Sequence, residues 1–328
     1  MTHRSDQMTH PTRRRRARPL LAVTAAAVVI VLAAVIVAAL RHKPAADAVP
    51  PPPGTLPHTP GTYLGVYAAK VPLSYTGVTA FTTNIGVKPD VVMYYSGWYE
   101  RFRASFAAAA AEHGAVPLIQ MEPKNVSLAT IAAGKYDAYL AQFAVHVKAY
   151  HHPVILSFGH EMNGFWYSWA NRHTSPATFV AAWRHVVTLF RNLGARNVTW
   201  LWTVNVIDTR HNRIPSPRPW WPGSAYVNWV GIDGYYQKPN YAFAPLFGPT
   251  IAKVRAFTHD PILIAETGVA TVAGQPTKIA DLFQGIHDYG LLGFVWFDST
   301  DTENFRIKSP AAAAAFREGA KTYKFPAS

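Results

Sequence analysis

The chain has 328 residues, of which 49% are hydrophobic and 13% aromatic, so it can bury a large core and is not a disordered chain. Its formal net charge is +13, but residues 1–48 carry eight Lys/Arg against two Asp/Glu and contribute +6, which leaves +7 for the rest. The densest basic run lies directly before an apolar stretch, where the positive-inside rule for membrane segments explains it. We therefore expect no nucleic-acid partner. The absence of cysteine indicates that stability comes from core size rather than disulfides.

The first 60 residues predict a membrane anchor followed by a spacer. Residues 1–18 form a basic arm expected in the cytoplasm, and residues 19–40 are uncharged and long enough to cross a hydrocarbon core of about 30 Å as a helix. Residues 41–60 are rich in proline and predict a semi-rigid linker. We expect a single-pass protein of the cell membrane with residues 61–328 outside. Secretion after cleavage is the alternative, because residues 46–48 (Ala-Asp-Ala) have the small-x-small form of a cleavage site.

Beyond the linker, short β-rich apolar runs alternate with helical patterns, as is typical of repeated βα units around a parallel sheet. Eight runs predict strands over 63–69, 91–98, 116–122, 154–161, 198–205, 229–236, 262–266 and 292–298. Ser175-Pro176 and Ser309-Pro310 each predict the start of a helix, and an Ala-rich stretch before Gly114 predicts another. No GxGxxG motif follows the first strand. The pattern favours the α/β class and a closed (β/α)8 TIM barrel over an open dinucleotide-binding sheet.

Glu161 and Glu266 stand at the ends of predicted strands, where a barrel of this type places its reactive groups. Glu161 ends the fourth strand and Glu266 the seventh. Cleavage of a glycosidic bond needs one carboxylic acid to protonate the leaving oxygen and one carboxylate to attack or to activate water. Alternation along the seventh strand predicts that Ile262, Ile264 and Glu266 share one face. The pair predicts glycoside hydrolysis, with the two carboxyl groups about 5 Å apart if configuration is retained.

These segments resemble glycoside hydrolase family 26, whose best-known members are β-mannanases. The resemblance extends from about residue 61 to the C-terminus. Its motifs are His-Glu-Met-Asn-Gly at 160–164 followed by Trp166, Asp-Gly-Tyr at 233–235, Ile-Ala-Glu-Thr-Gly at 264–268, and Trp296.

The resemblance implies a role for several of these residues. Glu161 would be the acid/base and Glu266 the nucleophile, with Tyr235 donating a hydrogen bond to Glu266. Trp166 would be an aromatic platform just past the scissile bond, and Trp296 would lie beneath the sugar at the cleavage point. Because a nucleophile must stay ionised and an acid protonated, we expect Glu161 to have the higher pKa of the pair.

Further polar residues are candidates for contacts with the sugar. They are His160, Asn163, Asn205 and Asp233. A zinc site at His160 is not expected, because the HExxH pattern requires histidine where Gly164 stands. We therefore predict neither a metal nor another cofactor.

Aromatic residues near the predicted strand ends are candidates for stacking on sugar rings. They are Trp166, Tyr167, Trp169, Trp220, Trp221 and Trp296. Trp183 and Trp200 are expected in the core instead. Trp220 and Trp221 fit either role, because they lie in a proline-rich loop from Ile214 to Gly223 that is hard to bury.

The substrate is less well defined than the reaction. Mannanases of the family usually carry an Arg-Pro pair just before the His-Glu, whereas this chain has Leu-Ser-Phe-Gly at 156–159. The Trp-Tyr-Ser-Trp segment at 166–169 is also closer to members that act on other β-glycans. We expect an endo-acting, retaining, β-1,4-mannanase-like enzyme. The alternatives are a mixed-linkage β-glucanase or xylanase of the same family, or a catalytically silent barrel that only binds polysaccharide.

Overall fold

The structure is a computed structural model that describes residues 56–209, 211, 213–271, 274–301 and 303–323. The predicted membrane helix over residues 19–40 and nearly all of the linker lie outside these residues. The chain divides into two units, Met1–Pro50 and Pro51–Ser328, and everything below concerns the second. Among the helices of the described part, none combines the length and the apolar character that crossing a membrane requires.

Eight parallel strands close into a barrel in sequence order, with β1 paired to β8. The strands are β1 (Tyr63–Ala68), β2 (Val91–Gly97), β3 (Val116–Glu122), β4 (Val154–Phe158), β5 (Val198–Asn205), β6 (Trp229–Asp233), β7 (Ile262–Thr267) and β8 (Gly293–Asp298). The prediction of a closed α/β barrel is therefore confirmed.

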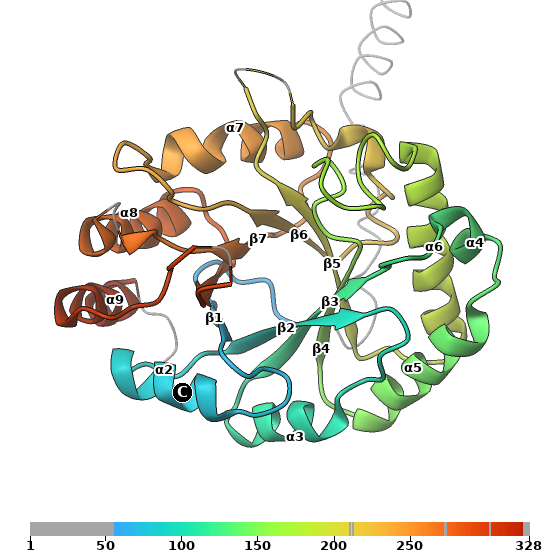
Figure 1. Ribbon diagram of the computed structural model, residues 1–328, viewed down its shortest axis with the longest axis horizontal. Helices are drawn as coiled ribbons and strands as arrows, with labels where there is room; N and C mark the ends of the chain where they lie inside the picture. Colours follow the sequence, from blue (N-terminus) through green and yellow to red (C-terminus); the bar gives the residue numbers. More distant parts are fainter. Residues whose placement is uncertain (1–55, 210, 212, 272–273, 302, 324–328) are drawn as a thin grey trace, which may run out of the picture. The chain divides into compact units, whose positions relative to one another are not determined.

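Helices surround the strands as an outer ring, as Figure 1 shows. They are α2 (Thr76–Ile85), α3 (Ala104–Glu112), α4 (Leu128–Ala132), α5 (Asp137–Tyr150), α6 (Pro176–Asn192), α7 (Phe243–Arg255), α8 (Gln275–Asp288) and α9 (Pro310–Thr322), with a short 3-10 helix η1 (Arg218–Trp220). Both predicted Ser-Pro helix starts are confirmed. The Ser175 hydroxyl accepts from the Thr178 amide, and the Ser309 hydroxyl accepts from the Ala312 amide.

The strands are buried on both sides, because side chains that point inward fill the barrel and those that point outward pack under the helices. Trp183 of α6 and Trp200 of β5 are both buried and their rings lie 6.3 Å apart, so both belong to the core as predicted. Inside the barrel, Tyr63 packs against Trp229 with ring centroids 4.9 Å apart. This filled core holds the C-terminal ends of the strands in fixed positions, and the candidate site lies there.

Candidate active site

The segment after β4 places Glu161 in a tight turn rather than at the end of a strand. β4 ends at Phe158, three residues earlier than predicted, and Gly159 and Glu161 both adopt left-handed backbone conformations, with φ of 59° and 53°. The Glu161 amide donates to the Thr203 carbonyl of β5 at 2.9 Å, which fixes the turn against the neighbouring strand. A left-handed glutamate is strained, and such strain persists where the surroundings hold a functional residue in place.

Two side chains donate hydrogen bonds to the Glu161 carboxylate. Asn205 Nδ2, at the end of β5, donates to Oε1 at 2.5 Å, and Trp166 Nε1 donates to Oε2 at 2.7 Å. The Trp166 ring folds back over Gly164 so closely that a Cβ there would lie 2.6 Å from its Cζ2 atom. Gly164 is therefore required for this position of Trp166.

Glu266 reaches the same face from β7 through an irregularity in the sheet. Ile264 pairs with Ile232 of β6, whereas Glu266 pairs with the next residue, Asp233, so the register shifts by one residue between them. Because successive residues point to opposite faces, the shift places Ile264 and Glu266 on opposite sides of the sheet. The prediction that Ile262, Ile264 and Glu266 share one face is wrong for this reason.

Three side chains donate hydrogen bonds to the Glu266 carboxylate. Tyr95 of β2 donates its hydroxyl to Oε1 at 2.6 Å, and Tyr235, just after β6, donates to Oε2 at 2.7 Å. Gln120 of β3 adds a longer bond to Oε1 at 3.4 Å. The structure thus gives Tyr235 the orienting contact expected for it. Tyr95 and Gln120 were missed, although they lie three and two residues before the ends of their predicted strands.

Burial dominates the electrostatics of the two glutamates. It raises the pKa of Glu161 to about 8, assisted by the charge of Glu266, and it raises the pKa of Glu266 to about 7. The hydrogen bonds from Tyr95 and Tyr235 act in the opposite direction, because they favour the ionised form of Glu266. The two groups titrate as a pair. Hydrogen bonds stabilise the negative charge on Glu266 better than the negative charge on Glu161. The pair therefore holds a proton near neutral pH, as an acid and a nucleophile require.

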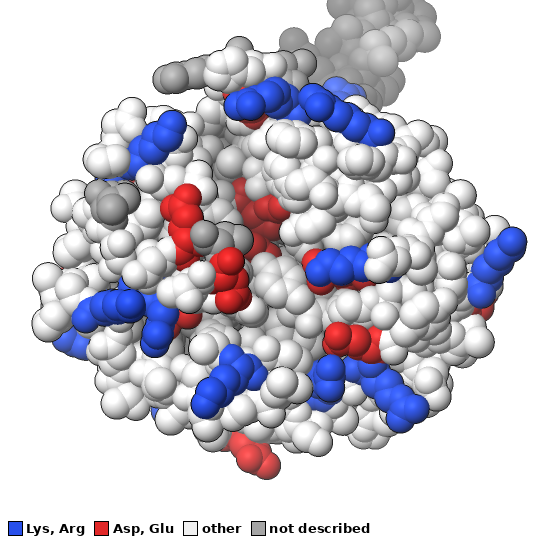
Figure 2. Space-filling model, in the orientation of Figure 1, with Lys and Arg blue, Asp and Glu red and all other residues white. Residues whose placement is uncertain are grey.

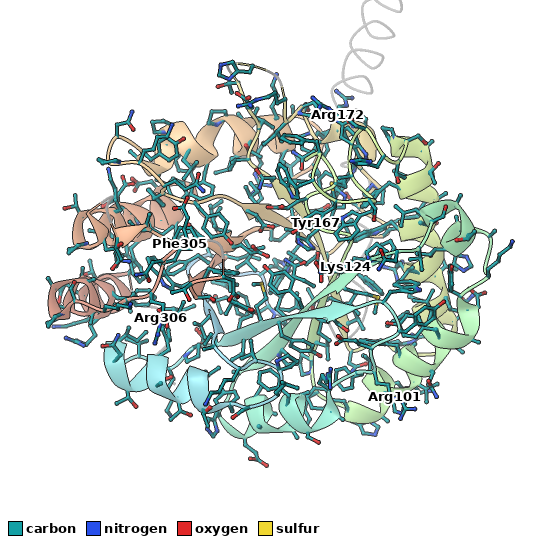
Figure 3. The ribbon with its side chains drawn as sticks, in the orientation of Figure 1. Arg101, Lys124, Tyr167, Arg172, Phe305 and Arg306 are labelled. Carbon is teal, nitrogen blue, oxygen red and sulfur yellow. The ribbon has the colours of Figure 1, made fainter. Side chains whose placement is uncertain are left out.

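An ion pair lies beside the two glutamates, at the end of β3. Glu122 is buried and forms an ion pair with Lys124 Nζ at 2.7 Å. The charge of Glu122 raises the pKa of Glu266. Neither residue was predicted, although Glu122 ends the predicted strand 116–122 just as Glu161 and Glu266 end theirs. Figure 3 shows Lys124 near Tyr167 over the middle of this face.

Asp233, predicted to contact the sugar, is completely buried beneath the two glutamates. Burial, followed by the charges of Glu266 and Glu161, raises the pKa of its carboxyl well above the usual value. Burial and the neighbouring charges thus disfavour the ionised form of Asp233. Its position is that of a support below the carboxylates, out of reach of a sugar.

Two other predicted contact residues are held within the protein. Both bonds between the Asn163 side chain and the Asn205 backbone measure 2.8 Å, one in each direction, so Asn163 fixes the end of β5. His160 is buried with Nε2 3.1 Å from the Tyr167 hydroxyl, and burial lowers its pKa to about 3, so it is neutral. Both residues position neighbours that reach the groove, whereas Asn205 and Trp166 themselves line it.

The aromatic candidates divide by exposure. Trp166 is 42% exposed and remains a candidate for stacking on a sugar ring, and Tyr167 is partly exposed above Trp169, onto which it stacks at 4.3 Å. Trp169 and Trp220 are buried, and Trp221 packs against Trp202.

The structure does not bring Trp296 to the groove. Its side chain is fully buried and lies 5.7 Å from Phe316 of α9, on the outer side of the sheet. The next residue, Phe297, takes the inner side because side chains alternate along β8. Phe297 stacks on Tyr67 at 4.5 Å and lies 5.8 Å from Tyr235, so it belongs to the wall of the site.

A pocket of about 800 Å³ begins beside the glutamates and extends over the ends of β5 and β6. Trp166, Asn205 and Tyr235 line its inner part, and each donates a hydrogen bond to Glu161 or Glu266. Figure 2 shows acidic side chains recessed in the hollow at the middle of this face, with basic side chains spread around the rim. The volume is within the range of about 300–1,000 Å³ typical of ligand pockets.

Comparison with known proteins shows that the chain is similar to glycoside hydrolases. Residues 117–268 match the family model described as glycosyl hydrolase family 26. Endoglucanase H of Acetivibrio thermocellus is 31% identical over 275 residues, which cover 79% of this chain and 30% of that protein. Beta-1,3-xylanase TXYA of a Vibrio species is 27% identical over 169 residues, covering 48% of this chain and 35% of that protein. The chain thus spans about a third of the length of the curated relatives it matches.

Solved structures share the fold at lower sequence identity. The GH26 beta-mannanase of Bacteroides ovatus superposes with a TM-score of 0.61 at 16% identity, over 81% of this chain and 90% of that one. A modular endo-beta-1,4-mannanase of Cellulomonas fimi gives a TM-score of 0.59 at 17% identity, over 80% of this chain and 71% of that one. By the family match, the segment 117–268, which contains both glutamates, is that of glycosyl hydrolase family 26.

Proposed function

We propose that the barrel is a retaining, endo-acting β-glycan hydrolase in which Glu161 is the acid/base and Glu266 the nucleophile. The observation that carries the proposal is the pair of buried glutamates with different hydrogen-bond partners. Glu266 accepts from Tyr95 and Tyr235, which favour its ionised form, while the charge of Glu266 adds to burial in raising the pKa of Glu161. A silent binding barrel has no need of this arrangement.

In the proposed first step, protonated Glu161 gives its proton to the glycosidic oxygen while ionised Glu266 attacks the anomeric carbon. The leaving chain departs along the pocket next to Trp166, and a covalent glycosyl intermediate remains on Glu266. In the second step, ionised Glu161 takes a proton from water, which attacks the same carbon and releases Glu266. Two inversions give net retention.

The backbone of the substrate is proposed as a β-linked glucan, mannan or xylan. The relatives differ in what their names say they act on: an endoglucanase, a β-1,3-xylanase and β-mannanases. The 31% identity to the endoglucanase, together with Leu-Ser-Phe-Gly at 156–159, favours a glucan over the mannan that the sequence resemblance first suggested.

Hydrolysis of a polymer panel tests the proposal. Wild type and Glu266→Ala are incubated with β-mannan, mixed-linkage β-glucan and β-xylan, and new reducing ends are measured. Each polymer is also used in a form that carries carboxylates. We expect wild type to release oligosaccharides from at least one polymer and Glu266→Ala to release none. Binding without cleavage by both proteins would support the silent barrel instead.

We also propose that the barrel works outside the cell, tethered through residues 19–40. The charge pattern around this segment supports an orientation with residues 1–18 inside. Protease added to intact cells that express the full chain is expected to digest the barrel, and the protein is expected in the membrane fraction. Release into the medium would indicate cleavage.

A further inference from the structure

The pocket beside Glu161 lies on the leaving-group side of the proposed cleavage point. Its inner wall contains Trp166 and Asn205, which hydrogen-bond to Glu161, the group that protonates the departing oxygen. Tyr235, which donates to Glu266, lines the pocket as well. Two of these three residues contact the group that protonates the departing oxygen, so the leaving sugar is assigned to this pocket. Its outer wall determines which sugars are accepted there.

The outer wall carries basic side chains from two loops. Lys238, after β6, is exposed, and within the described residues it forms no ion pair; its ammonium lies 6.0 Å from the ring centroid of Tyr241. Arg213, after β5, also lines the pocket and has a side chain that is 63% exposed. Two cations from separate loops thus border one cavity.

Asp208 offsets only part of this charge. Its Oδ2 lies 3.3 Å from Arg213 Nε, and its Oδ1 accepts from the His211 amide at 3.0 Å. The contact with Asp208 is made by Nε, and the Arg213 side chain is 63% exposed, so a ligand in the pocket can approach the guanidinium. A planar guanidinium with free amino groups matches the geometry of a carboxylate.

The catalytic centre itself is unsuited to an anionic sugar, because Glu161, Glu266 and Glu122 are close together there. A carboxylate on the substrate is tolerated only where basic groups outnumber acidic ones. The outer pocket meets this condition, because Lys238 and Arg213 carry two positive charges and Asp208 carries one negative charge. The charge of +7 outside residues 1–48 also favours the approach of an acidic polymer.

We propose that the leaving-group pocket binds a sugar that carries a carboxylate, as a uronic acid does, and that Lys238 and Arg213 recognise this group. The inference rests on the proposed function and narrows it to acidic or acid-substituted β-glycans. It makes Lys238 and Arg213 specificity residues that act on substrate binding, and it gives them no part in the chemical step.

The test compares one backbone with and without carboxylates. Mixed-linkage β-glucan and β-mannan are used in native form and after oxidation of a fraction of their C6 hydroxymethyl groups to carboxylates. We expect wild type to have a higher kcat/KM on the oxidised polymer. The charged sugar should lie at the new non-reducing end of the released leaving-group fragment, as read by mass spectrometry.

Variants locate the recognition. Lys238→Gln and Arg213→Gln should each lower the ratio of kcat/KM on the oxidised polymer to kcat/KM on the native polymer about five- to tenfold, the size of one exposed charge-assisted contact. Lys70→Gln removes the same charge from a separate cavity beside α2 and should keep the wild-type preference.

Each other outcome has a distinct meaning. If wild type cleaves neither form of either polymer and also leaves β-xylan intact, the proposed function fails. If it cleaves native and oxidised polymers equally well, the hydrolase stands and the carboxylate site is refuted. If the preference exists but Lys238→Gln and Arg213→Gln behave like Lys70→Gln, recognition by this pocket is refuted.

Discussion

Replacing Tyr95 by phenylalanine should shift the ionisation of the proposed nucleophile. The Tyr95 hydroxyl donates to Glu266 Oε1 at 2.6 Å, and without it this oxygen keeps only the 3.4 Å bond from Gln120. A hydrogen bond to a charged group contributes about 1.5–3 kcal/mol, and one pKa unit corresponds to about 1.4 kcal/mol. Loss of the bond disfavours the ionised form, so the pKa of Glu266 should rise by about one to two units.

The assay is the pH dependence of kcat/KM on a polymer that wild type cleaves. In Tyr95→Phe the acidic limb should move upward by about one to two pH units, whereas the basic limb, which reports loss of the proton from Glu161, should move much less. Tyr94→Phe is the matched control, because the Tyr94 ring packs against Phe106 under α3 at 5.5 Å and not against Glu266. An acidic limb that stays in place in Tyr95→Phe would refute the role assigned to this hydroxyl.

Three further predictions concern the surroundings of Glu161. Gly164→Ala places a Cβ 2.6 Å from the Trp166 ring, and Trp166→Phe removes the indole N–H, so both variants lose the hydrogen bond to the Glu161 carboxylate. Each should lower kcat/KM at least about tenfold. Unchanged activity of either variant would contradict this. Glu161 has a pKa raised to about 8 in the fold, so the stability it contributes is complete below the unfolded value near 4.5 and is lost as pH rises toward 8. The free energy of unfolding of Glu161→Gln, measured by denaturant titration, should therefore exceed that of wild type by at most about 3 kcal/mol at pH 7 and by little at pH 4.5. A difference that does not vary with pH would rule out this cause. Asn163→Ala removes two buried bonds to the Asn205 backbone and should lower Tm by about 4–8 °C, a loss of about 2 kcal/mol, which calorimetry would detect; an unchanged Tm would show that β5 does not depend on this anchor.

Local sequence patterns predicted the elements because their causes are local. Ser175 and Ser309 cap the helices that they were expected to cap, and each predicted strand has a counterpart in the barrel. Glu161 and Glu266 were found because the carboxyl ends of parallel strands meet on one face, so two acidic strand ends far apart in sequence become neighbours.

The remaining features depend on how strands pair, which the sequence does not display. The register shift in β7 reverses the side on which Glu266 lies relative to Ile264, and only the hydrogen bonds to β6 reveal it. Trp296 was assigned to the groove from its motif, although alternation along β8 sends it outward and Phe297 inward. Tyr95 stands on a strand with no acidic end, so nothing drew attention to it until its partner Glu266 was in place.

The stereochemistry of the first product tests the central claim most directly. Wild type is mixed with the polymer it cleaves, and proton NMR follows the anomeric signals of the new reducing ends before mutarotation equilibrates them. Attack by Glu266 followed by water activated through Glu161 predicts that the β-anomer appears first and the α-anomer grows in later. Initial appearance of the α-anomer would mean a single displacement by water, and Glu266 would not be the nucleophile.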